Sequence, residues 1–484
     1  MNKKLICLLS TAIFLVGCQN NGASSVNINP AEETCVIKED VNIDFLCMLN
    51  NTFLPKLQTI IDNFKEIEPH IKVNLFNPSG SGQYSTLEKG IVTGFFEDDY
   101  PDISQCYADD VVKYLHYDKV TNVDTYINNS DYGLSAEDKQ DYIQSFLEEG
   151  SSYSVDGTYS LPFCKSSEVM YYNADKLIGL ELPGINEGKP IDDAYLNSLT
   201  WEELFDNLCP ALENYDETHD QKLVIHKGID GNDVSHPYVV YDSTENFFIT
   251  LAKQYEYGYT SVGQDGKGQI NFNNANMRAL VKSMRQYRQK GYLETGTTVN
   301  GWTSDYFTAN RSLFSISSTA GLSYNTSENF KIGAARIPTA KNKPNISINQ
   351  GPSICIFKHF DKNGNLDTNR ELASFLLWKY ITNQENTVKW ELETDYMGIR
   401  LSSYTAQEYI NALNNKKDLA KAANLQKIAE ISANLYNTDV FRGSSEARTY
   451  SGQLFKSCLL SNDIDAEIED LFDNCVESIN YYLE

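Results

Sequence analysis

The residues of this chain that could do chemistry favour non-covalent binding over catalysis. The six histidines are scattered and no G-x-S-x-G pattern marks a nucleophilic serine, so nothing indicates a Ser-His-Asp hydrolase. The cysteines have long, irregular spacings without a C-x-x-C pair, which argues against a zinc site. Tyrosine is abundant, with 31 residues beside 22 phenylalanines and 4 tryptophans. Its flat apolar ring and its hydroxyl together suit it to holding a small polar molecule.

One loop, at 361–369, carries Asp and Asn residues in an arrangement like that of a calcium-binding EF-hand. Leu366 stands where such a loop requires glycine for its sharp turn. We therefore interpret 361–369 as a plain loop, and we expect neither a metal nor a cofactor.

The amino terminus carries the pattern of a secretory signal. Lys3 and Lys4 precede an uncharged, mostly apolar stretch at 5–16, which is shorter than the roughly 20 residues that span a bilayer. Residues 15–18 read Leu-Val-Gly-Cys and resemble the lipobox of bacterial lipoproteins, in which the cysteine becomes the lipidated amino terminus. We expect a signal peptide at 1–17 and a flexible tether at 18–40 that begins with lipidated Cys18. The alternative is an ordinary signal peptide with an incidental cysteine.

Composition indicates an acidic protein with two domains. The chain has 484 residues and a net charge of −26, which becomes −28 once Lys3 and Lys4 leave with the signal. Such a surface repels nucleic acids and anionic lipid headgroups, so a nucleic-acid function is not expected.

Eight cysteines remain after the signal and the lipidated position. They are Cys35, Cys47, Cys106, Cys164, Cys209, Cys355, Cys458 and Cys475. Several stand in apolar runs, where a buried thiol acts as a small hydrophobic group. Outside the cytoplasm thiols can also pair. The sequence does not decide between one or two disulfides and none. Cys458 and Cys475 are the first pair to test.

Hydrophobic periodicity predicts an α/β fold. Apolar runs at 41–49 and 71–76 flank helical spacing at 54–67, which is a strand–helix–strand unit. Capping patterns open helices at 135–138 and at 200–204. Further predicted elements are helices at 87–96, 247–254, 277–287 and 372–378 and strands at 169–172 and 313–317.

Five stretches in this order are similar to motifs of the extracellular solute-binding proteins of ABC importers, in the group that includes maltose- and oligosaccharide-binding proteins. The stretches are Tyr-Pro-Asp-Ile at 100–103, the crossing at 156–175, Thr-Trp-Glu-Glu-Leu at 200–204, the strand and small-residue loop at 315–321, and the segment 391–400. The stretch 442–448 also resembles the family. Met-Gly-Ile at 397–399 replaces the usual aromatic-Pro-Val, and the chain is longer than common members.

The resemblance implies a two-lobed periplasmic-binding-protein-like fold of type II, with a ligand cleft between lobes joined by crossing hinge strands. We expect an N-terminal lobe of residues 41–163 with 305–358, and a C-terminal lobe of residues 164–304 with 359–484. A hinge motion would close the lobes over the solute.

The same resemblance, carried over position by position, implies a set of ligand-binding residues at strand ends, at the crossings and in the second lobe. They are Asn50, Asn51, Tyr107, Asp109, Lys165, Ser166, Asn246, Phe247, Trp302, Ser318, Thr319, Gly351, Tyr396 and Arg400. Asp109 could equally be a solvated surface residue, Arg400 a structural ion pair, and Trp302 a residue packed against the hinge.

The expected function is capture of a carbohydrate and its delivery to the transmembrane subunits of an ABC permease, by a monomer anchored on the extracellular face of a single-membrane bacterium. Alternatives are binding of a non-sugar solute such as a glycerol phosphate, peptide or polyamine, a secreted glycoside hydrolase, and a surface adhesin or structural lipoprotein. A phosphate ligand would need converging cations, for which Lys165 and Arg400 are the only suitable pair. A hydrolase would need two carboxylates about 5–10 Å apart.

Overall fold

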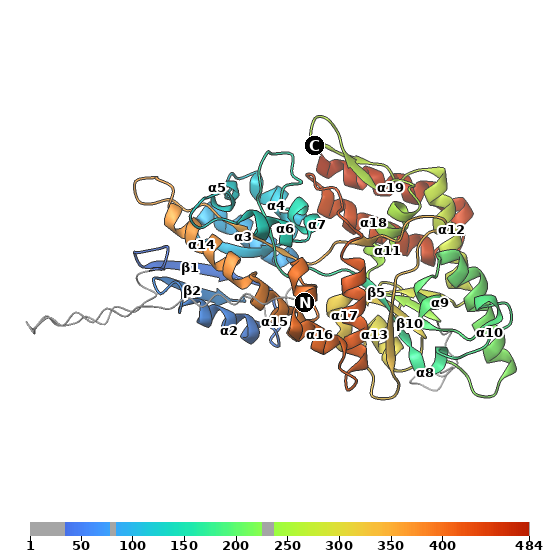
Figure 1. Cartoon of the computed structure of the whole chain (residues 1–484). Coiled ribbons are helices and arrows are strands. Elements are labelled where there is room, and N and C mark those ends of the chain that lie inside the picture. The colour runs from blue at the N-terminus through green and yellow to red at the C-terminus, as the bar shows by residue number, and fades with distance from the viewer. Residues whose placement is uncertain (1–33, 78–83, 225–236, 484) are drawn as a thin grey trace, which may run out of the picture.

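The computed structural model describes residues 34–77, 84–224 and 237–483. The predicted signal peptide, Cys18 and most of the predicted tether lie outside these residues. The described chain forms two α/β lobes that lie side by side (Figure 1). Within the described residues, no helix is both long and apolar enough to cross a membrane.

The first lobe is built on a five-stranded sheet in the order β2-β1-β3-β13-β4. Its strands are β1 (Val41–Leu46), β2 (Ile71–Phe76), β3 (Ile103–Cys106), β4 (Leu161–Pro162) and β13 (Ser353–Ile356). β1 pairs in parallel with β2 and β3, and β13 is antiparallel to β3 and β4. Helix α2 (Leu54–Phe64) connects β1 to β2, as the apolar spacing predicts, but ends three residues before Ile67.

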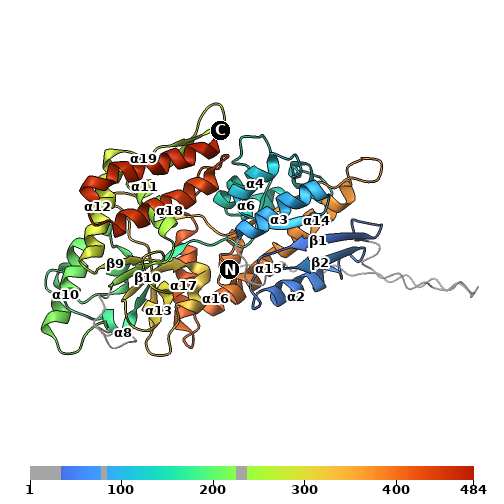
Figure 2. The same cartoon turned by 180° about the vertical axis from the view of Figure 1, so that it is seen from behind.

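The second lobe has a five-stranded sheet in the order β11-β5-β10-β6-β9. Its strands are β5 (Glu168–Asn173), β6 (Val239–Tyr241), β9 (Leu293–Thr295), β10 (Phe314–Ser318) and β11 (Ile332–Arg336). On one side of this sheet pack α11 (Thr244–Gln254), α12 (Ala275–Gln289), α18 (Ser444–Leu460) and α19 (Ile464–Leu483). Seen from behind, α18 and α19 face α3 (Tyr84–Glu97) and α4 (Ala108–Leu115) of the first lobe (Figure 2).

The chain crosses between the lobes three times, at 163–167, at 349–352 and between η4 (Leu401–Thr405) and α17 (Leu419–Ile431). Ser166 and Gln350 pair backbone to backbone where the first two crossings meet. Beside them, the short strands β12 (Ser347–Ile348) and β14 (Leu435–Tyr436) pair in parallel.

The lobe boundaries differ from the expected ones. Residues 305–348 belong to the second lobe, because β10 pairs with β5 and β6 while β11 pairs with β5. Residues 359–405 belong to the first lobe, because α14 (Thr368–Ile381) packs on β1 and α2. Trp378 of α14 donates its indole N–H to the carbonyl of Pro162 at 2.9 Å, which fixes the helix under the first sheet.

Local predictions at helix starts agree with the structure. Ser135 accepts from the N–H of Asp138 at 3.0 Å in a capping box, and Thr200 accepts from the N–H of Glu203 at 3.0 Å. All eight cysteines of the described chain are buried, and the structure contains no Cys458–Cys475 disulfide. Both thiols lie in the packing between α18 and α19, where they fill apolar space.

Candidate functional site

A cavity of about 620 Å³ lies between the lobes, at the carboxyl ends of strands from both sheets. Tyr107 and Asp109 follow β3 of the first lobe, Asn246 follows β6 of the second, and all three line it. The rest of this interlobe cavity is formed by α3, α4, the helix α7 (Gln144–Glu149), α11, α18, α19 and the crossing at 349–351. Ligands of open α/β sheets bind at such strand ends, and the volume suits a small molecule.

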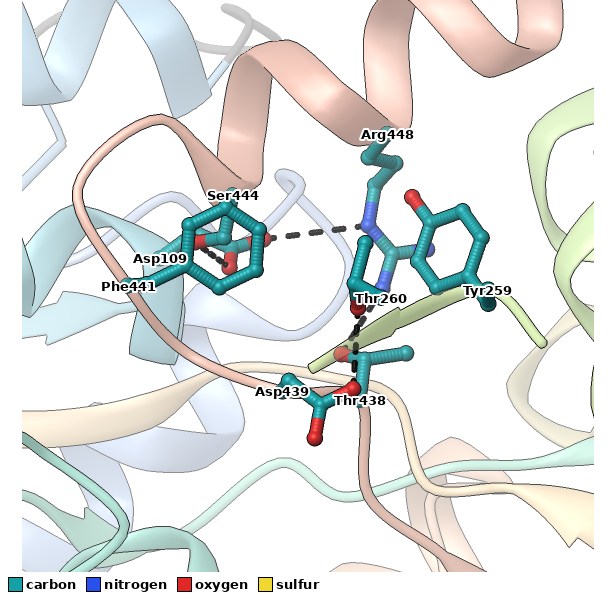
Figure 3. A pocket seen from close by; sticks show the side chains of 8 residues that line it. All are labelled: Asp109, Tyr259, Thr260, Thr438, Asp439, Phe441, Ser444 and Arg448. Atoms are coloured by element: carbon teal, nitrogen blue, oxygen red, sulfur yellow. Dashed lines mark hydrogen bonds and ion pairs between the residues drawn. The ribbon is translucent and has the colours of Figure 1, made fainter. Parts of the chain in front are cut away.

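Beside the interlobe cavity, side chains of the two lobes contact each other directly (Figure 3). Ser444 donates its hydroxyl to the Asp109 carboxylate at 2.5 Å, and Arg448 Nε lies 3.7 Å from the same carboxylate. Lys113 of α4 adds a second ion pair to Glu446 of α18 at 3.4 Å. The first turn of α18 is therefore held against α4 by charge-assisted contacts.

Asn246 is the centre of a buried polar network on the second lobe. Its side-chain oxygen accepts from Arg448 at 2.6 Å, and its amide donates to Glu168 at 3.1 Å and to Gln350 at 2.7 Å. Burial raises the pKa of the Glu168 carboxyl to about 7, although Tyr241 and Asn246 donate to it. The network fixes Arg448 and Gln350 at the edge of the cavity.

Tyr396 lies in an aromatic cluster of the first lobe. It stacks on Trp390, with ring centroids 6.3 Å apart, and Phe53 meets it edge-on at 6.1 Å. Burial raises the pKa of Tyr396 well above its ordinary value, and Cys164, Tyr107 and Tyr324 raise it further. Tyr107 belongs to the first lobe and Tyr324, which is 64% exposed, to the second. Tyr396 itself is not part of the lining of the interlobe cavity.

An ion pair at the crossings joins a fully buried lysine to a largely buried glutamate. Lys165 is 0% exposed, and its ammonium donates to Glu149 at 2.6 Å and to the carbonyl of Gly351 at 2.9 Å. Gly351 has φ +88°, and a Cβ there would lie 2.2 Å from the carbonyl oxygen of Cys164, so only glycine fits. Ser166 lies beside this pair and is also buried.

Of the fourteen residues predicted for the site, Tyr107, Asp109, Asn246 and Gly351 line the interlobe cavity, and Lys165 and Ser166 lie directly behind it. Ser318 caps the short helix η3 (Thr319–Tyr324), and the buried Thr319 accepts from the N–H of Ser167. These two residues hold the loop that carries Tyr324.

Several predicted residues have structural positions instead. Phe247 is 0% exposed in the core of the second lobe, where it stacks on Tyr241, because every face of α11 is covered. Arg400 is buried and binds Asp138 and the carbonyl of Thr382, so it holds the first lobe together.

The remaining predicted residues lie outside the interlobe cavity. Asn50 accepts from the backbone N–H groups of Thr52 and Phe53 in the turn that precedes α2, and Asn51 next to it is exposed. Trp302 is 74% exposed at the start of α13 (Thr303–Thr308).

Sequence reasoning missed Glu149 and Asn349, and it named Ser444 and Arg448 only within a family-like stretch. Nothing local marks Glu149 or Asn349, because the bond between them joins residues that are 200 positions apart in the chain. Ser444 and Arg448 stand at the start of α18, and the resemblance of 442–448 to the family was the one available signal.

Two α/β lobes that enclose a solute-sized cavity at their strand ends define a two-lobed solute-binding protein. The sequence matches the family described as bacterial extracellular solute-binding protein over residues 59–421, and the chain belongs to this family. Its members act outside the cytoplasm and bind solutes for ABC permeases. A search of curated protein sequences gives no match.

Solved structures share the fold at low sequence identity. UgpB from Mycobacterium tuberculosis, in complex with glycerophosphocholine, has a TM-score of 0.66 at 18% identity, over 92% of this chain and 98% of that one. The cyclic alpha-maltosyl-1,6-maltose binding protein from Arthrobacter globiformis has a TM-score of 0.66 at 13% identity, over 92% of this chain and 99% of that one. The sugar-binding protein MalE from Xanthomonas citri has a TM-score of 0.66 at 16% identity, over 91% of this chain and 98% of that one.

Proposed function

We propose that this chain captures a carbohydrate between its lobes and delivers it to the transmembrane subunits of an ABC permease. The observation that carries the proposal is that tyrosines from both lobes, Tyr107 of the first and Tyr450 and Tyr482 of the second, line a polar interlobe cavity. Aromatic faces stack on the C–H patches of a sugar ring, while amides, hydroxyls and carboxylates bond its hydroxyls. The sugar-binding proteins among the structural neighbours support this class of solute.

The charges around the cavity favour a neutral sugar over a phosphate ester. The two cations suitable for a phosphate are already committed, because Lys165 is bound to Glu149 and Arg400 to Asp138. Among the cations that line the cavity, Arg448 is shared between Asp109 and Asn246, and Lys113 is paired with Glu88 and Glu446. A phosphate would have to displace these carboxylates.

Calorimetric titration with a panel of mono- and oligosaccharides tests the proposal. Tyr107→Ala and Tyr450→Ala are expected to lower the affinity for the bound sugar at least about tenfold, since each removes a stacking surface from the cavity lining. Phe96→Ala is the matched control, because Phe96 is 75% exposed at the far end of α3. Unchanged affinity in both tyrosine variants would remove this site, and a panel without any binding sugar would remove the solute class.

We also propose that the protein is a monomeric lipoprotein held on the outer face of the cell membrane through Cys18, without a catalytic step of its own. A lipid anchor keeps a binding protein beside its permease, and stable anchoring takes more than one acyl chain. Cys18→Ser is expected to move the protein from the membrane fraction to the medium, as immunoblotting of the fractions would show. Release of reducing sugar from oligosaccharides would contradict the non-catalytic role.

A further inference from the structure

The carboxylate of Glu149 joins both β-strand crossings to the first lobe. It accepts from Lys165 of the first crossing at 2.6 Å, and from Asn349 of the second crossing at 3.1 Å. A third donor, the hydroxyl of Ser353 at the start of β13, lies 2.9 Å away. A change in the angle between the lobes must therefore rearrange the bonds at this one group.

The same bonds reach the segment that leads into α18. Asn349 donates to the side-chain oxygen of Asn437 at 2.7 Å, and Asn437 donates in turn to the carbonyl of Ser145 in α7 at 2.8 Å. Asn437 follows β14 and precedes α18, the helix that contacts α4 across the cleft. Glu149 is thus connected to the hinge and to the helix that closes on the first lobe.

This group of residues also borders the interlobe cavity. Glu149, Asn349 and Gly351 all line it, whereas Asn437 does not. Asn349 is 4% exposed, and its side-chain oxygen has no hydrogen-bond partner within the described part of the chain. A buried acceptor without a donor costs about 1–3 kcal/mol. A solute hydroxyl that donates to this oxygen would remove that cost.

We infer that Glu149 is a positioning residue that couples solute binding to hinge closure, with Asn349 as the point where the solute is sensed. A hydroxyl bound at Asn349 fixes that side chain, which holds Glu149 and Asn437 in the arrangement of the closed lobes. The inference rests on the proposed solute-binding function but concerns how binding moves the lobes.

Asn437→Ala provides the sharpest test, because this side chain does not line the cavity. We expect the affinity for the best sugar of the panel to fall about fivefold to tenfold, the effect of losing its two hydrogen bonds. Glu149→Gln combined with Lys165→Met is the second variant, since it removes the charge pair without leaving a buried charge. Asn273→Ala, which removes a hydrogen bond to Asp473 within the second lobe, is the control.

Interlobe distances distinguish a hinge role from a merely structural one. Spin labels at Glu66→Cys in the first lobe and Glu187→Cys in the second would report them by pulsed electron resonance, since the cysteines of the described chain are buried. In Asn437→Ala and in the Glu149→Gln/Lys165→Met double variant, the distribution of interlobe distances is expected to be broader than in the unmodified protein. Sugar is expected not to narrow this distribution in either variant.

Unchanged distances, with or without a loss of affinity, would overturn the inference. If no sugar binds to the unmodified protein, the proposed solute class fails, while the distances of the ligand-free variants still decide whether Glu149 and Asn437 set the hinge.

Discussion

Removing one hydroxyl outside the interlobe cavity should weaken solute binding. Ser444 donates to Asp109 across the lobes at 2.5 Å but does not line the interlobe cavity. Ser444→Ala leaves the lining and both lobes intact, and it removes a bond that exists only while the lobes are together. Any loss of affinity must therefore come from the equilibrium between open and closed forms.

The magnitude follows from the charge on the acceptor. A hydrogen bond to a charged group contributes about 1.5–3 kcal/mol, and about 2 kcal/mol shifts the closed-to-open ratio about 30-fold. If the ligand-free protein is mostly open, the affinity falls by that whole factor. If it is about 90% closed, the variant is about a quarter closed and the affinity falls about fourfold. The expected loss is therefore about 4- to 30-fold.

Calorimetry gives the affinity, and small-angle scattering of the ligand-free protein gives the radius of gyration. The radius should rise in Ser444→Ala if the ligand-free protein is mostly closed, and the loss of affinity should approach about 30-fold if it is mostly open. Ser461→Ala is the control, because Ser461 makes a matching bond to Glu467 at 2.6 Å within the second lobe. If Ser444→Ala matches the unmodified protein in both measurements, the contact does not stabilise closure and the reasoning is refuted.

Three further predictions concern stability. Burial raises the pKa of the fully buried Glu391 to about 8, above its unfolded value. Its ionisation should therefore lower the free energy of unfolding as pH rises from about 5 to 9. Between about pH 5 and 9, the free energy of unfolding of Glu391→Gln, measured by urea titration, should rise on the order of 4 kcal/mol relative to that of the unmodified protein. The surface variant Glu408→Gln should show no such change. Asp102→Asn breaks the paired bonds to Arg370 at 2.5 and 2.7 Å and should cost about 2–3 kcal/mol, measured in the same way, because Arg370 is one-third exposed. Gly351→Ala should lower the melting temperature by several degrees, since φ +88° and the Cys164 carbonyl exclude a Cβ.

Local chemistry predicted much of the fold. The strand–helix–strand unit at the start of the first lobe, the capping box at Ser135 and the cap at Thr200 all follow from interactions within a few residues. Such interactions can be predicted from the sequence, because a helix cap or an amphipathic face depends only on residues of the same turn, helix or strand.

The lobe boundaries could not be read in this way, because strand pairing is decided by contacts far apart in the chain. β10 runs antiparallel to β5 although about 140 residues separate Phe314 from Tyr172. The pattern at 313–317 predicts a buried strand but contains nothing that selects a sheet. Residues 359–405 return to the first lobe for the same reason, since the apolar face of α14 would cover either sheet.

The site shows where residue type stops being informative. Lys165 and Arg400 were predicted as site residues from the resemblance, and both are buried, yet each is paired with an acidic partner that the sequence does not identify. Asp102, in the family-like stretch at 100–103, binds Arg370 from 268 residues away and supports the sheet.

Tyr107 and Asp109, by contrast, line the cavity, because the end of a parallel strand is a position that the topology itself directs toward the cleft. The sequence is therefore most informative about a binding site where backbone geometry brings residues together. It is least informative where a charge must be matched by a distant partner, and the connections from Glu149 to Asn349 and Asn437 belong to that second kind.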